Sequence, residues 1–195
     1  VYSGIGSQWL EMGRDLMKIP LFAQSIEKCH GILMNKGIDL KNILISADED
    51  TFSNVLHSYV GIIAIEIALT DILKELNIVP DYIIGHSVGE LGCAYADNCL
   101  TAEETLLAAY ARGEASRESQ TIQGAMAAVG MNHLKLKEIV PDDIDIACHN
   151  GEDSSTISGP VKSIHDLIDK LKEDKVFVKE VACSGVPLHS RYIKE

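Results

Sequence analysis

The pattern Gly85-His86-Ser87-Val88-Gly89 is the part of the sequence best suited to covalent chemistry. In a G-x-S-x-G pattern the serine sits on a sharp turn between a strand and a helix, where its hydroxyl stands out as a nucleophile. Glycines on either side permit that turn, because a side chain there would collide with the neighbouring strand or helix. The backbone N–H of Val88 would then point toward a developing oxyanion. We therefore predict a nucleophile at Ser87, and the alternative is a glycine turn with a surface serine.

A serine hydroxyl needs a general base, most often a histidine, to act as a nucleophile near neutral pH. Among seven histidines, His189 in Val186-Pro187-Leu188-His189-Ser190 is the favoured candidate, because the chain order Ser then His suits an α/β protein. His86 is a weaker candidate for the base, since adjacent residues on such a turn generally point apart. The other histidines fall in predicted helices or at a strand end: His30, His57, His133, His165 and His149.

The elements that would hold this serine are readable from the pattern of apolar residues. The segment 81–85 is short and rich in residues that favour strands, so it predicts a buried strand. Residues 89–96 predict the helix after the turn. From 53 to 77, apolar residues recur at helical spacing over more than one face, which predicts a largely buried helix. Thr101-Ala102-Glu103-Glu104 has the capping-box form, so a further helix is expected from there to about Ser116. This order is typical of an α/β protein.

Shorter elements follow from Gln123 onward. We predict strand, helix, strand, strand, helix and strand at 125–129, 134–140, 144–148, 155–158, 161–172 and 176–181. This β-α-β-β-α-β order is the split pattern of ferredoxin-like domains. The expected organisation is an α/β body of residues 1–122 and 184–195 and a ferredoxin-like subdomain of residues 123–183. The chain opens without an initiator Met or a signal-peptide layout, and we expect a body that is incomplete at both ends.

Composition limits the possible classes of protein. The 195 residues carry 17 Lys and Arg against 29 Asp and Glu, a net charge of −12, and 46% are hydrophobic, which predicts a folded acidic protein. Without a basic run, a nucleic-acid partner is not expected. The longest apolar run, Tyr59 to Ala68, is interrupted by Glu66 and is too short for a membrane span of about 20 residues, so no membrane partner is expected. Five cysteines without a CxxC pair argue against a disulfide framework or a metal site and favour a reducing, cytoplasmic location.

Several segments taken together resemble one family. They are Gly4-x-Gly6-Ser7-Gln8, Gly85-His86-Ser87-Val88-Gly89-Glu90, Tyr110-Ala111-Arg112-Gly113, Gly124-Ala125-Met126-Ala127-Ala128-Val129 and Leu188-His189-Ser190. The set closely resembles the malonyl/acyl-CoA:acyl-carrier-protein transacylase domains of fatty acid synthases and polyketide synthases. Cys148-His149-Asn150-Gly151-Glu152-Asp153-Ser154 with Ser158-Gly159-Pro160 looks most like the animal type I fatty acid synthase branch. The resemblance spans nearly the whole chain and implies an α/β-hydrolase-like body with a parallel sheet, a ferredoxin-like subdomain, and a site in the cleft between them.

The resemblance also implies roles for individual residues. Ser87 matches the acylated nucleophile, and His189 matches the general base that activates it. Gln8 matches the glutamine that arranges the oxyanion hole, with the Val88 N–H as donor. Arg112 matches the arginine that pairs with the free carboxylate of a malonyl group, a task that suits the bidentate guanidinium. From the residues alone, Arg112 would be interpreted as a solvated helix arginine.

Four further residues are candidates for substrate binding, and one of them is His86. Met126 and Asn150 match positions that line the pocket and the base of the small subdomain, although by themselves they are typical of a core methionine and a turn asparagine. Leu188 stands where malonyl-preferring relatives often carry Phe, so a wider range of acyl groups is open, including methylmalonyl.

The expected reaction is a two-step acyl exchange through a serine ester. Malonyl-CoA or acetyl-CoA would be the donor, the phosphopantetheine thiol of an acyl carrier protein the acceptor, and the domain itself would bind no cofactor. Ketosynthase and other domains of the same fatty acid or polyketide megasynthase are expected partners. One alternative is a serine hydrolase or thioesterase, for which Asp166 and Asp169 are acids after Ser87, but only inside a predicted helix. Another is a non-catalytic domain, against which the intact set of matched residues argues.

Overall fold

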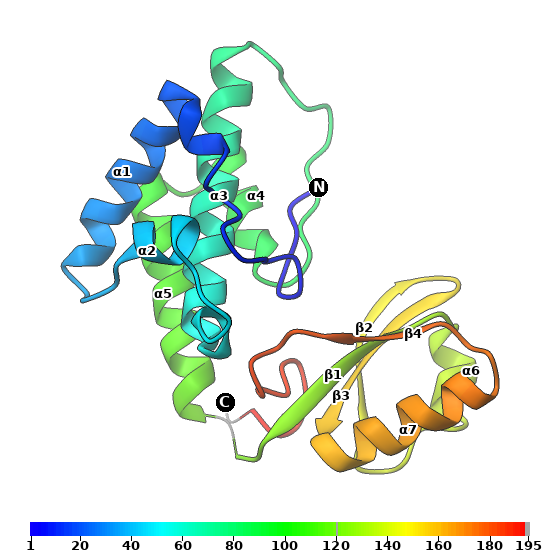
Figure 1. The fold of residues 1–195 in the computed structure, drawn as a ribbon. Helices are drawn as coiled ribbons and strands as arrows, with labels where there is room; N and C mark the ends of the chain where they lie inside the picture. The colour runs from blue at the N-terminus through cyan, green and yellow to red at the C-terminus, as the bar shows by residue number, and fades with distance from the viewer. Residues whose placement is uncertain (120, 194–195) are drawn as a thin grey trace. The chain divides into compact units, whose positions relative to one another are not determined.

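The computed structural model describes residues 1–119 and 121–193 and has a mixed helix and strand fold (Figure 1). The chain forms two compact units, Val1–Ala115 and Ser116–Glu195. In the part of the chain that is described, the first unit is built from helices, whereas the second contains a four-stranded antiparallel sheet with two helices.

The first unit is organised around one long buried helix. Its α-helices are α1 (Pro20–Met34), α2 (Leu40–Ile45), α3 (Val55–Glu75), α4 (Gly89–Ala96) and most of α5 (Ala102–Ser119), with single 3-10 turns at η1 (Leu16–Lys18) and η2 (Thr51–Ser53). Helices α1, α2 and α4 all pack against α3. The helix begins at Asn54, whose side chain accepts a hydrogen bond from the N–H of Leu56 at 3.0 Å. The prediction of a largely buried helix at 53–77 is thus confirmed.

Helix α3 also has the length and hydropathy of a membrane span, the one such helix among residues 1–119 and 121–193. However, 67% of its most apolar 18-residue stretch is buried inside the protein. Residues at its centre such as Val60, Ile63 and Ala64 have no exposed surface. Such burial is typical of a core helix, so the length and hydropathy of α3 give no argument for a membrane segment.

The helices predicted at 89–96 and from Thr101 onward are confirmed as α4 and α5. At the start of α5 the capping box is formed in full, because the N–H of Glu104 donates to Oγ1 of Thr101 at 3.2 Å and the N–H of Thr101 donates to Oε2 of Glu104 at 2.9 Å. Helix α1 contains His30, which the sequence placed in a helix without giving its bounds, and α2 was not among the predicted elements.

The strand predicted at 81–85 is wrong as a strand, and with it the parallel sheet expected in the body. The segment makes a single isolated parallel bridge, between Tyr2 and Gly85. The N–H of Tyr2 donates to the oxygen of Ile84 at 2.8 Å, and the N–H of His86 donates to the oxygen of Tyr2 at 2.9 Å. Within the described residues, Tyr2 is the one residue that pairs with this segment as a neighbouring strand would. The side chains of Tyr82 and Ile84 are not buried, since these residues are 93% and 64% exposed. A parallel strand needs neighbours along its length, and one bridge does not supply them.

The second unit contains β1 (Gly124–Val129), α6 (His133–Lys137), β2 (Asp145–Gly151), β3 (Ser154–Pro160), α7 (Val161–Glu173) and β4 (Val178–Val181). The predicted β-α-β-β-α-β order of elements is confirmed. The strands are arranged β2-β3-β1-β4, and all three pairs are antiparallel. Apolar residues of α7 recur at helical spacing and pack with inward residues of β1 and β3 in one core. Its fully buried members include Ala127, Leu136, Ile157, Ile164 and Leu171.

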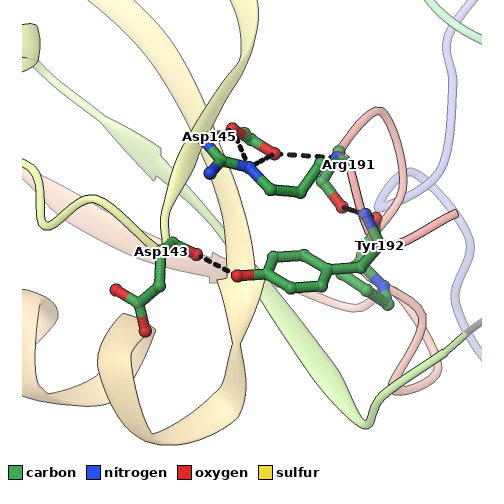
Figure 2. A network of polar contacts seen from close by, with 6 residues as sticks. Asp143, Asp145, Arg191 and Tyr192 are labelled. Atoms are coloured by element: carbon green, nitrogen blue, oxygen red, sulfur yellow. Dashed lines mark hydrogen bonds and ion pairs between the residues drawn. The ribbon is translucent and has the colours of Figure 1, made fainter.

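Residues 184–193 differ from the expected domain organisation. The sequence placed them in the body, whereas in the structure they belong to the second unit. The N–H of Gly124 donates to the oxygen of Gly185 at 2.8 Å, which ties the segment to the start of β1. Near its end, Arg191 pairs with Asp145, as Figure 2 shows. These long-range bonds hold the segment against the sheet, and no local pattern in the sequence encodes them.

Candidate active site

Ser87 lies in a tight turn between the bridge residue Gly85 and the first residue of α4. Its backbone φ of 56° is in the left-handed region, which is uncommon for a residue other than glycine. Two backbone hydrogen bonds close the turn, from the N–H of Gly89 to the oxygen of His86 at 3.0 Å and from the N–H of Glu90 to the oxygen of Ser87 at 3.2 Å. A strained serine immediately before a helix is the local geometry that the G-x-S-x-G pattern predicts.

Close backbone approach explains both glycines of the pattern. A Cβ atom on Gly85 would lie 2.7 Å from Sγ of Cys93 and from the backbone of Glu90, both in α4. A Cβ atom on Gly89 would overlap the backbone carbonyl of Tyr2. The turn is therefore packed between the N-terminal segment and α4 with no space for a side chain at either position.

The two residues predicted to form the oxyanion hole lie on the N-terminal segment and at the start of α4. Gln8 lies in the N-terminal segment, which pairs with the turn through the bridge between Tyr2 and Gly85. Its Oε1 accepts a hydrogen bond from the N–H of Gly6 at 2.8 Å. Because the carbonyl end of this side chain accepts that bond, its NH₂ group is the end that donates. Val88 caps the start of α4, where backbone N–H groups have no acceptor within the helix. Their part in an oxyanion hole stays a prediction.

Arg112 lies on α5 and is half-buried. Its guanidinium carbon is 5.9 Å from the centre of the Tyr59 ring, which presents the ring's negative face to the cation. No carboxylate of residues 1–119 or 121–193 forms an ion pair with Arg112. Within the described chain its positive charge is thus not neutralised by an acidic side chain, as a carboxylate-binding role requires.

His189 lies in a loop of the second unit formed by residues 186–192, which we call the His189 loop. Its φ is also 56°, in the left-handed region. On its N-terminal side, Val186 and Leu188 are 2% and 4% exposed. On its C-terminal side, the hydroxyl of Ser190 donates to the oxygen of Pro187 at 2.5 Å. The loop is therefore an ordered turn around His189, fixed by burial and by its own hydrogen bonds.

The remaining substrate-binding candidates have different surroundings. Met126 on β1 is 4% exposed, as is Leu188. Asn150 on β2 donates from Nδ2 to Oγ1 of Thr156 at 3.0 Å. His86 precedes the serine in the turn of the first unit. For all four residues, contact with a substrate stays a prediction.

The predicted site residues divide between the two units. The first contains Gln8, His86, Ser87, Val88 and Arg112, and the second contains Met126, Asn150, Leu188 and His189. Within the first unit, the N-terminal segment lies against the turn, since a Cβ atom on Gly4 would be 3.0 Å from Cβ of Ser87. Contact of Gln8 with the turn stays a prediction. The pairing of Ser87 with His189 stays a prediction.

Sequence reasoning missed Glu66 as a component of this region. Its Oε2 atom is buried with no hydrogen-bond partner among the described residues, and a Cβ atom on Gly92 of α4 would overlap it. Burial raises the pKa of Glu66 to about 8, against the opposing effects of a hydrogen bond from the Ser3 backbone and of the charge on the amino group of Val1. The one signal in the sequence is an acid inside an apolar run, which gives no indication that the carboxyl lies under α4.

An apolar cavity of about 280 Å³ in the first unit is lined by residues of α3 and of the segment after it, including Leu69, Leu73, Ile78 and Tyr82. None of the predicted site residues lines this cavity. In the described part of the chain, no group of three or more His, Cys, Asp or Glu side chains is placed to hold a metal ion. The five cysteines are free thiols.

Comparison with known proteins identifies the family. The acyl transferase domain family matches residues 1–195. A reducing polyketide synthase of Botryotinia fuckeliana is 32% identical over 99% of this chain, and prosolanapyrone synthase of Alternaria solani is 34% identical over 99%. The chain spans only 9% and 8% of the length of these two relatives.

Solved structures agree in fold. The acyltransferase domain of the polyketide synthase PpsC of Mycobacterium tuberculosis aligns with a TM-score of 0.82 and 27% identity, over 95% of this chain and 56% of that one. The malonyl-CoA:ACP transacylase of Synechocystis sp. PCC 6803 aligns with a TM-score of 0.74 and 24% identity, over 92% of this chain and 59% of that one, a likeness of fold alone. The chain therefore belongs to the acyl transferase domain family.

Proposed function

We propose that this chain transfers a malonyl or acetyl group from coenzyme A to the phosphopantetheine thiol of an acyl carrier protein, through an ester on Ser87. The observation that carries the proposal is the left-handed turn at Ser87, packed against α4 in a chain of the acyl transferase domain family. A serine held on such a turn presents its hydroxyl for attack on a carbonyl carbon.

The reaction takes place in two matched halves. His189 accepts the proton of the Ser87 hydroxyl while Oγ attacks the thioester carbon, and the tetrahedral intermediate collapses as the C–S bond breaks. The departing thiolate of coenzyme A takes the proton from His189 and leaves as a thiol. The thiol of the carrier protein then gives its proton to His189 and attacks the ester, and Ser87 leaves with that proton. The free enzyme is thereby regenerated with no net change in its protons.

Three residues assist both halves. The NH₂ group of Gln8 and the N–H of Val88 stabilise the oxyanion of each tetrahedral intermediate. Arg112 holds the free carboxylate of a malonyl group, a role that its lack of an ion pair in the described chain supports. Such anchoring positions the ester for a thiol and disfavours attack by water.

The proposal includes the architecture and setting that the sequence suggested. The element order and the strand order β2-β3-β1-β4 of the second unit support a ferredoxin-like description of that unit. The two relatives, one of them named a reducing polyketide synthase, are more than ten times longer than this chain, which supports ketosynthase and carrier-protein domains as partners in one megasynthase. We propose a cytoplasmic location and no cofactor bound by the domain itself.

The test is formation of a serine ester from radiolabelled malonyl-CoA, followed by its discharge with an acyl carrier protein. The wild-type chain and a control variant, Ser53→Ala, which alters an exposed serine in η2, should both form a labelled ester, whereas Ser87→Ala should form none. Addition of carrier protein should move the label to its thiol. An undiminished ester in Ser87→Ala would overturn the assignment of the nucleophile, and release of free malonate in place of transfer would identify a hydrolase.

A further inference from the structure

The left-handed backbone of His189 needs support from its surroundings. A non-glycine residue at a φ of 56° is in a sparsely populated region, and this conformation persists only where neighbouring contacts determine it. Ser184 and Gly185, just before the His189 loop, also have positive φ, at 57° and 73°. Two non-glycine residues, Ser184 and His189, therefore have uncommon backbone conformations that the rest of the second unit must hold.

The N-terminal side of the loop is held by packing. Pro187 is buried and lies so close to Gly124 that a Cβ atom there would overlap its ring. The N–H of Gly124 donates to the oxygen of Gly185 at 2.8 Å, and Leu188 is 4% exposed. The entry to His189 is thus fixed to the first residue of β1.

The C-terminal side is held by polar contacts with the start of β2. Arg191 donates to Asp145 from its backbone N–H at 2.8 Å, from Nε at 3.0 Å and from Nη2 at 2.5 Å (Figure 2). The hydroxyl of Tyr192 donates to the backbone oxygen of Asp143 at 2.9 Å, and the oxygen of Tyr192 accepts from the N–H of Thr121 at 3.1 Å. Arg191, two positions after His189, thus binds the Asp145 carboxylate with both its backbone and its side chain.

The Asp145 carboxylate is well suited to this task. Its side chain is only 22% exposed, and the hydrogen bonds from Arg191 lower its pKa, so it stays ionised at neutral pH. A planar guanidinium matched to a carboxylate in two parallel bonds restricts orientation as well as distance. Because the guanidinium of Arg191 is already paired with Asp145, Arg191 is less suited than Arg112 to bind a substrate carboxylate.

We infer that Asp145 and Arg191 are positioning residues, which together hold the His189 loop so that the imidazole keeps the orientation in which it accepts a proton. The inference rests on the proposed function of His189 as general base. A misplaced base slows proton transfer without weakening the binding of the acyl donor. The pair should therefore affect the rate of ester formation rather than the KM for malonyl-CoA.

The test is a double-mutant cycle on the full chain with Asp145→Asn, Arg191→Lys and the double variant. Asp145→Asn keeps the shape and one acceptor, and Arg191→Lys keeps the charge but loses the paired geometry. Each single variant should slow ester formation at saturating malonyl-CoA by about 10- to 100-fold, while the final amount of ester per chain stays unchanged. Because the residues act as one unit, the double variant should be no slower than the slower single variant. Lys162→Gln, which breaks the exposed Lys162–Asp166 ion pair in α7, is the matched control and should react at the wild-type rate.

A second measurement separates this inference from the proposed function. Amide hydrogen exchange at residues 186–193 should be faster in Asp145→Asn than in the wild type or in Lys162→Gln, whether or not the chain forms an ester. Wild-type exchange in Asp145→Asn would overturn the inference, as would losses that multiply in the double variant. A fall in the amount of ester at an unchanged rate would also overturn it, because that is the result of a smaller folded fraction. A wild-type chain that forms no ester would instead overturn the proposed function.

Discussion

Glu66→Gln tests the cost of holding an acid under α4. The carboxyl of Glu66 lies against Gly92, with Oε2 buried and unpaired among the described residues, and burial raises its pKa to about 8. The nearby Tyr2 and Cys93 also have raised pKa values, chiefly because of burial, so they are neutral at pH 7. Near neutral pH, Glu66 is therefore the group in this cluster whose protonation differs most between the folded and unfolded chain.

The sign of the effect follows from proton binding. Between pH 4.5 and about 8 the folded chain keeps the Glu66 proton that the unfolded chain has released, so the free energy of unfolding falls as pH rises through this range. The contribution of the Glu66 proton to the free energy of unfolding is fully present below pH 4.5, the pKa of Glu66 in the unfolded chain. It is lost as pH rises through about 8, the pKa of Glu66 in the folded chain. Each pH unit in the window corresponds to at most about 1.4 kcal/mol, so a neutral glutamine should stabilise the first unit at pH 7 by about 2–3 kcal/mol. The variant should show little of this dependence on pH.

The assay is urea unfolding followed by helical circular dichroism at pH 5, 6, 7 and 8. Glu75→Gln is the matched control, since it removes an exposed carboxyl from the same helix and should keep the wild-type profile. The wild type and Glu66→Gln should differ little at pH 5 and diverge steadily toward pH 8. Parallel profiles for these two proteins, or a less stable Glu66→Gln at pH 7, would refute the reasoning from burial.

Three further predictions concern the turn, the substrate and a helix cap. Arg112→Ala should reduce malonyl transfer about 10- to 100-fold more than acetyl transfer, because only malonyl offers a carboxylate to the guanidinium; equal losses in a parallel assay of both donors would contradict this role. Gly89→Ala should lower the free energy of unfolding by about 1–3 kcal/mol and abolish ester formation, since its methyl group would overlap the Tyr2 backbone; a urea titration that matches the wild type would show that the segment has room. Thr101→Ala should cost about 1 kcal/mol by removing the hydroxyl that caps α5, measured by thermal unfolding, and an unchanged Tm would argue against the cap.

The sequence determined the parts of this fold that depend on neighbours along the chain. Apolar spacing predicted α3, the capping box predicted the start of α5, and the glycine pattern predicted the turn at Ser87 before α4. The second unit's order of elements was also readable, because each of its short strands and helices has its own periodicity. These features need only propensities and contacts over a few residues.

Tertiary structure alone decided the rest. The β-rich segment 81–85 makes one bridge to Tyr2, because pairing partners, rather than β propensity, determine whether a segment becomes a strand. Residues 184–193 join the second unit through Gly124 and Asp145, which lie tens of residues earlier in the chain. Glu66 and Gly92 likewise meet only when α3 packs against α4. Local patterns determine which elements form, whereas contacts between residues distant in sequence determine which groups an element buries and holds, and such contacts have no signature in the spacing of residues.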